Sequence, residues 1–214
     1  QEQNVASGIK LPLYYFGHSF GALLGLALAG TYGSEFSGIV LSAPPQRPDF
    51  FTSFFGKIVV WIGKRFKGPH APARLPNTMT FGGYAKTVEG AHTKFDWLTR
   101  DEKIVADYIA DPKCNFVCSY SFYGDLMYGL AKVYGQGFFD AIPKGLPIYL
   151  FCGSRDPVIG QKPGFEKLTG QLRALALKDF EAKCYEGGRH ESLNELNKEE
   201  VLADVTAWFK KHLA

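Results

Sequence analysis

The chain has 214 residues, of which 46% are hydrophobic and 21% are charged, and its formal net charge at pH 7 is +3. This composition is typical of a globular domain with one sizeable core, and it argues against a disordered chain. The small net charge gives no basis for a nucleic-acid partner, and no apolar stretch is long enough to suggest stable membrane insertion.

The first predicted elements are a short buried strand, a glycine-bounded turn and an apolar helix. The strand is expected over residues 11–16. After it, Gly17, Ser19 and Gly21 form a Gly-x-Ser-x-Gly turn, which in this context is typical of a nucleophile elbow. Such a turn would expose the Ser19 hydroxyl at its tip, with the backbone N–H of Phe20 beside it as an oxyanion donor. The alternative is a glycine-rich turn whose serine caps the helix.

A second strand is predicted over residues 38–43, and after it the character of the sequence changes. Residues 46–140 are dense in Phe, Tyr, Gly and Pro and lack an alternating strand pattern. Residues 141–214 return to alternating strands and helices, as expected for an α/β sheet. We therefore predict a core made of residues 1–45 and 141–214, with a helical cap made of residues 46–140.

Helices are expected within the cap over residues 50–63, 101–109 and 119–134. The first of them is apolar on more faces than one sheet could cover. Its aromatic side chains either pack within the cap or line an acyl-binding groove, and packing is the commoner role for any single buried aromatic. The candidates for the acyl pocket are Phe50, Phe51, Phe54, Phe55 and Trp61.

Two later strands are each followed by a polar residue that could act together with Ser19. A strand over residues 147–152 precedes the loop with Asp156, and a strand over residues 180–185 precedes the loop with His190. The chain order Ser, Asp, His is the order found in elbow hydrolases. We predict Ser19 as nucleophile, His190 as general base and Asp156 as the acid that orients the base. Taken singly, Asp156 could be a turn former and His190 a solvated loop residue.

Several short motifs carry a resemblance to a known family: FGHSFG at residues 16–21, FDWLTRD at 95–101, GSRDPV at 153–158 and YEGGRHE at 185–191. With them, the chain resembles the α/β-hydrolases of the monoacylglycerol lipase and bacterial lysophospholipase-like group, which is of the serine aminopeptidase type. The resemblance implies the same nucleophile, base and acid. It also implies a mobile cap over an acyl pocket and no metal or organic cofactor.

The sequence departs from this family before the elbow. Family members usually have several strands there, and a His-Gly motif among them contributes a second oxyanion donor. Here the elbow strand starts about ten residues after Gln1, which is not a Met. We expect the strand over residues 11–16 to have an unpaired side, which would pair either with a second copy, most simply in a homodimer, or with an N-terminal segment missing from this chain.

The four cysteines show no zinc-site spacing, and Cys152 and Cys184 lie within predicted core strands. We expect all of them to be reduced, and a cytoplasmic location is the default expectation.

Together these features predict a serine carboxylic-ester hydrolase that cleaves short- to medium-chain acyl esters through an acyl-enzyme. Monoacylglycerol lipase or lysophospholipase activity is the close alternative. Two other classes stay open. One is a relative that binds ligands without catalysis, and the other is a peptidase that would hold a substrate amine with Glu89 and Asp96.

Overall fold

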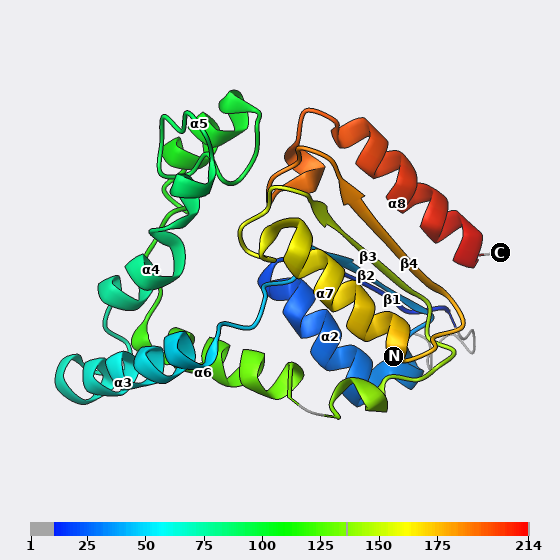
Figure 1. The fold of residues 1–214 in the computed structure, drawn as a ribbon, viewed down its shortest axis with the longest axis horizontal. Helices are drawn as coiled ribbons and strands as arrows, with labels where there is room; N and C mark the ends of the chain where they lie inside the picture. Colours follow the sequence, from blue (N-terminus) through cyan, green and yellow to red (C-terminus); the bar gives the residue numbers. More distant parts are fainter. Residues whose placement is uncertain (1–10, 136, 214) are drawn as a thin grey trace.

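The computed structural model describes residues 11–135 and 137–213. Within them, four parallel strands form one sheet in the order β1-β2-β3-β4, with helices on both of its faces (Figure 1). The predicted parallel α/β architecture is therefore confirmed. The strands are β1 (Tyr14–His18), β2 (Gly38–Ser42), β3 (Ile148–Gly153) and β4 (Phe180–Tyr185), and the helices that flank them are α2 (Phe20–Tyr32), α7 (Gln161–Ala174) and α8 (Lys198–Leu213).

The core lies in two layers, because successive side chains of a strand point to opposite faces of the sheet. On one face, Ile39 and Leu41 of β2 pack with α2 and α7. On the other face, Val40 of β2 packs with Trp208 of α8. Strands β2 and β3 are buried along their whole length, as expected for the centre of a parallel sheet that is covered on both sides.

Between β2 and β3 the chain leaves the sheet and forms a group of helices that extends to one side of it (Figure 1). This group has its own small core, which includes Val60 and Tyr120. A Cβ on Gly63 would lie 1.9 Å from a ring carbon of Tyr120, so a glycine is required for this approach. A hydrophobic core of its own is what a separate cap would need. The helices of this group are α3 (Phe50–Lys67), α4 (Arg74–Phe81), α5 (Glu102–Ala110) and α6 (Tyr120–Val133).

Strand β1 lies at the edge of the sheet and, in the part of the chain that the structure describes, pairs only with β2. It begins at Tyr14, three residues later than predicted, and continues to the elbow. Pro12 has no backbone N–H to give to a ladder, which accounts for the later start. Phe16 within β1 is 40% exposed.

None of the helices within residues 11–135 and 137–213 has the length and apolar character needed to cross a membrane.

Candidate active site

Ser19 occupies a strained position between β1 and α2. Its φ of 54° and ψ of −119° lie outside the regions that non-glycine residues usually adopt. The Ser19 N–H donates to the carbonyl of Ser42 at 2.8 Å, which fastens the turn to the end of β2. The Ser19 side chain makes no capping hydrogen bond to α2, so the alternative of a capping serine is not what the structure shows.

The two glycines of the turn differ in how tightly they are enclosed. A Cβ on Gly17 would lie 2.4 Å from the carbonyl oxygen of Gly21, a distance that requires the backbone to move. A Cβ on Gly21 would meet only the Tyr15 hydroxyl, at 3.8 Å. The close approach of strand and helix therefore depends on Gly17, whereas the space around Gly21 would admit a methyl group.

The structure brings Asp156, His190 and Ser19 together at the carboxyl ends of three parallel strands. Nδ1 of His190 lies 3.0 Å and 3.1 Å from the two carboxylate oxygens of Asp156, and Nε2 lies 2.9 Å from the Ser19 hydroxyl. Asp156 is fully buried and His190 is 3% exposed. Asp156 also accepts a hydrogen bond from the N–H of Val158 at 2.8 Å, so it shapes its own turn as well as facing the imidazole.

The environment of His190 favours the protonated imidazole. Burial by itself would lower the pKa of His190, because it penalises the charged form. The negative charge of Asp156, its hydrogen bond to Nδ1 and the charge of Glu191 outweigh this effect and raise the pKa above its ordinary value. A basic, oriented imidazole beside a serine hydroxyl is the arrangement that general-base catalysis needs.

The loop that carries His190 is bound to the FDWLTRD segment identified in the sequence. The N–H of His190 donates to the carbonyl of Trp97 at 3.3 Å, and the N–H of Glu191 donates to the carbonyl of Leu98 at 2.7 Å. The rings of Trp97 and His190 lie 5.3 Å apart. Arg189 adds a side-chain hydrogen bond from Nη1 to the Thr99 carbonyl at 2.9 Å. The imidazole of His190 is therefore positioned by a segment that lies between β2 and β3.

A buried carboxylate completes this attachment. Glu195 is 1% exposed, and its Oε1 accepts from the backbone N–H of Arg189 at 2.9 Å and of Arg100 at 3.1 Å. Its Oε2 accepts from Nε of Arg100 at 2.8 Å. A buried charge is tolerated when its hydrogen bonds are satisfied, as they are here. Nothing in the sequence pattern singled out Glu195, because its side-chain partner Arg100 lies 95 residues earlier in the chain.

Phe20 begins α2, so its N–H is one of those at a helix start that have no intrahelical acceptor. This places a donor and the positive end of the helix dipole directly after Ser19. The Phe20 ring contacts Phe122 of α6, with the ring centroids 5.8 Å apart. Phe20 and Phe122 both line a hollow of about 370 Å³ between α2 and α6, with Leu24 and Leu126 among the other lining residues. The place of Phe122 beside the elbow was not predicted from the sequence.

The aromatic residues proposed for the acyl pocket lie on α3 and are largely exposed, by between 50% and 75%. The ring of Phe50 contacts those of Phe51 and Phe54, and the ring of Phe54 also contacts that of Phe55. Phe50 and Phe54 line a hollow of about 180 Å³ against α6, and Trp61 lines a second hollow of about 280 Å³. These hollows differ from the one that begins at Phe20, and the role of the five residues in acyl binding stays a prediction.

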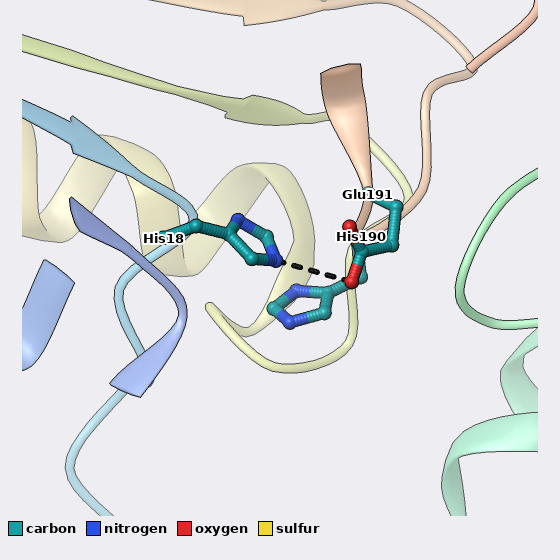
Figure 2. Close-up of side chains that lie close together, drawn as sticks. All are labelled: His18, His190 and Glu191. Carbon is teal, nitrogen blue, oxygen red and sulfur yellow. Dashed lines mark hydrogen bonds and ion pairs between the residues drawn. The ribbon is translucent and has the colours of Figure 1, made fainter. Parts of the chain in front are cut away.

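A further polar contact lies beside Ser19. Nδ1 of His18 lies 3.0 Å from the Ser42 hydroxyl, and Nε2 lies 3.3 Å from Glu191 (Figure 2). Burial would raise the pKa of Glu191, but the hydrogen bond from His18 and the charges of both nearby imidazoles lower it below its ordinary value. Neither His18 nor Glu191 was predicted to have a role. The only sequence feature that could have pointed to them is that His18 directly precedes Ser19 and Glu191 directly follows His190.

Comparison with known proteins places this geometry in context. The family model described as Hydrolase_4, serine aminopeptidase, S33, matches residues 2–197. A monoacylglycerol lipase of Mycolicibacterium smegmatis is 27% identical over 212 residues, which cover 95% of this chain and 64% of that protein. The chain thus spans just under two thirds of the curated relative.

Solved structures with the same fold include named esterases and lipases. A thermostable carboxyl esterase from Bacillus coagulans matches with a TM-score of 0.87 and 23% identity, covering all of this chain and 68% of that one. A monoglyceride lipase from Saccharomyces cerevisiae matches with a TM-score of 0.72 and 24% identity, covering all of this chain and 66% of that one. The predicted α/β-hydrolase fold is confirmed by these likenesses.

Proposed function

Because the chain belongs to the serine aminopeptidase S33 family, we propose that it is a serine carboxylic-ester hydrolase that works through Ser19, His190 and Asp156. The observation that carries this proposal is the continuous path of hydrogen bonds from Asp156 through both nitrogens of His190 to the Ser19 hydroxyl. A serine alcohol is a poor nucleophile, and a base at 2.9 Å with its own buried carboxylate supplies the activation that it lacks.

The reaction follows from the positions of these groups. Nε2 of His190 takes the proton of Ser19 as the hydroxyl oxygen attacks the ester carbonyl, and Asp156 stabilises the imidazolium that forms. The oxyanion receives the Phe20 N–H and the positive end of the α2 dipole. His190 then gives its proton to the leaving alcohol. A water molecule activated by the same imidazole releases the acid from the acyl-enzyme.

We propose short- to medium-chain acyl esters as substrates. Phe20, which directly follows Ser19, is one of the residues that line the hollow between α2 and α6, and this lining is mostly apolar. An apolar hollow at this place suits an acyl chain better than a charged group. Monoacylglycerol is the second candidate substrate, since the similar protein from Mycolicibacterium smegmatis is named a monoacylglycerol lipase.

We also propose that the protein is located in the cytoplasm.

The peptidase alternative has less support. A peptidase of this type would need a free carboxylate to hold a substrate amine. The carboxylate of Asp96 instead accepts hydrogen bonds from the backbone N–H groups of His92, at 2.7 Å, and Thr93, at 3.2 Å. Glu89 is an exposed residue in a different turn. The pairing on which this alternative rested is therefore weakened by local hydrogen bonding.

We further propose that, in the active protein, another strand pairs with the edge of β1 that faces away from β2. An edge strand with exposed apolar side chains is a template for such pairing. A second copy of this chain is the expected partner, and a segment outside the described residues is the alternative. Light scattering across a dilution series, with activity measured in parallel, tests this. An active monomer at every concentration would contradict the dimer.

The main proposal is tested with a panel of p-nitrophenyl esters of increasing acyl length beside aminoacyl-p-nitroanilides. We expect hydrolysis of the esters, little or no release from the anilides, and loss of ester hydrolysis in Ser19→Ala. A fluorophosphonate probe should label Ser19 alone. Ester hydrolysis that is unchanged in Ser19→Ala would refute the assignment, and faster release from the anilides would favour the peptidase.

A further inference from the structure

Two imidazoles and a carboxylate converge beside the nucleophile. One nitrogen of His18, one nitrogen of His190 and one carboxylate oxygen of Glu191 all lie within 4.8 Å of one another (Figure 2). The three side chains come from two distant parts of the sequence: His18 ends β1, and the adjacent residues His190 and Glu191 follow β4. The rings of the two histidines have centroids 4.7 Å apart. Two imidazole nitrogens and one carboxylate form a ligand set that Zn²⁺ commonly takes, with a fourth position left for water.

The outer contacts of both histidines suit metal binding through Nε2. A metal-bound histidine usually donates its other ring N–H to a carboxylate or another oxygen, which fixes the ring. Nδ1 of His190 already faces the buried carboxylate of Asp156 at 3.0 Å. Nδ1 of His18 faces the Ser42 hydroxyl at 3.0 Å, and a hydroxyl can accept that N–H. Binding an ion through Nε2 therefore replaces the contact of His190 with the Ser19 hydroxyl and releases the proton that His18 shares with Glu191.

The site is accessible as well as oriented. The side chains of His18 and Glu191 are 28% and 29% exposed, whereas His190 is almost fully buried and fixed. The two more exposed side chains can therefore adjust around an ion held by the fixed one. Nε2 of His18 and Oε1 of Glu191 lie 3.3 Å apart. This distance is long for a charged hydrogen bond and allows both atoms to bind the same ion.

We propose that His18, His190 and Glu191 form an inhibitory site for a divalent transition-metal ion, with Zn²⁺ as the best match. Nε2 of His190 has a single lone pair, and in the free protein that lone pair faces the Ser19 hydroxyl at 2.9 Å. An ion on this nitrogen occupies the lone pair, so Nε2 can no longer accept the serine proton and the Ser19 hydroxyl keeps it. The metal-bound enzyme therefore has an intact fold and an unactivated nucleophile.

Binding is tested on protein that cannot react. Isothermal titration of the Ser19→Ala variant with Zn²⁺ should show one ion per chain. Adding His18→Gln or Glu191→Gln to that variant should weaken the affinity at least tenfold, since each removes one of three ligands. His70→Gln is the matched control, because His70 is exposed in the connection between α3 and α4 and should leave the affinity unchanged. Equal affinity in all four proteins, or no binding to the Ser19→Ala parent, would overturn the proposal.

A second measurement follows the nucleophile itself in the unmodified chain. Zn²⁺ should slow labelling of Ser19 by a fluorophosphonate, EDTA should restore it, and the effect should be at least tenfold weaker in Glu191→Gln than in His70→Gln. Zn²⁺ that binds without slowing the labelling would refute the inhibitory role. The titration needs no turnover, so its result stands whether or not the chain hydrolyses esters, and the two proposals fail separately.

Discussion

Trp97 and His190 are joined twice, by a hydrogen bond from the His190 N–H to the Trp97 carbonyl at 3.3 Å and by rings whose centroids lie 5.3 Å apart. The indole therefore covers the imidazole of the proposed base. Burial of that imidazole makes its charged form depend on the two carboxylates nearby.

Asp156→Asn should lower kcat for ester hydrolysis by roughly 10⁴-fold while leaving the fold intact. The amide keeps the size of the carboxylate, and its oxygen can still accept from Val158, but it cannot stabilise the imidazolium. Steady-state kinetics beside circular dichroism measures both effects. A variant with near-normal kcat would show that Asp156 only shapes its turn.

Glu191→Gln should extend activity to lower pH. The base works only when His190 is neutral, so the acid limb of the kcat/KM profile follows the pKa of His190. The charge of Glu191 helps to raise that pKa, and its removal lowers the pKa and moves the acid limb to lower pH. The profile is measured in EDTA, with exposed Glu89→Gln as the matched control. A limb that stays in place, or moves to higher pH, contradicts this assignment.

Gly17→Ala and Gly21→Ala should differ sharply. The new methyl group on Gly17 would lie 2.4 Å from a backbone oxygen, so we expect a poorly folded or inactive protein. At Gly21 the nearest atom is at 3.8 Å, and alanine in a helix is favoured over glycine by roughly 0.5–1 kcal/mol. Thermal unfolding of the pair tests this. Equal loss of stability in both would show that the motif needs both glycines.

Phe122→Ala should change the acyl-length preference, because Phe122 lines the hollow that begins at Phe20. One methylene in an apolar pocket is worth roughly 1–3 kcal/mol, so widening the hollow should favour longer chains measurably. Phe54→Ala and Phe55→Ala test the earlier prediction for α3 in the same ester series. A profile that shifts only in the α3 variants would place the acyl chain there.

Glu195→Ala should lower the free energy of unfolding by on the order of 1–3 kcal/mol, because it removes the carboxylate that accepts from Arg100 and leaves the N–H of Arg189 without its acceptor. Urea unfolding measures the loss, and exposed Glu199→Ala is the control. We also expect kcat to fall, since the loop with His190 loses an anchor. A variant as stable as the control would mean that Glu195 does not hold the loop.

The parts of the molecule set by local pattern were predictable from the sequence. Ser19, Asp156 and His190 each follow a predicted strand, and parallel strands present their carboxyl ends at one edge of the sheet. The first boundary was misplaced because Pro12 sits inside the apolar run. Helix α4 was missed because it is short and carries Pro76 in its first turn, where a proline is tolerated.

The contacts that depend on tertiary packing were not predictable. His18 meets Glu191 from a sequence separation of 173 residues, and no spacing rule connects them. The contact of Phe122 with Phe20 likewise depends on how α6 crosses α2. Helical spacing indicated a helix over residues 119–134, but it could not say against which partner Phe122 would pack.

The attachment of residues 95–101 to the His190 loop has a consequence for exchanging parts between related proteins. The change in composition along the sequence suggests segment boundaries near residues 46 and 140. An exchange of the segment between them would replace the helices together with Trp97. The imidazole of His190 would then contact residues from the other protein. The backbone N–H of His190 would face carbonyl groups of that protein instead of the Trp97 carbonyl. To keep His190 in its present orientation, an exchange must take residues 95–101 and residues 189–195 from the same protein.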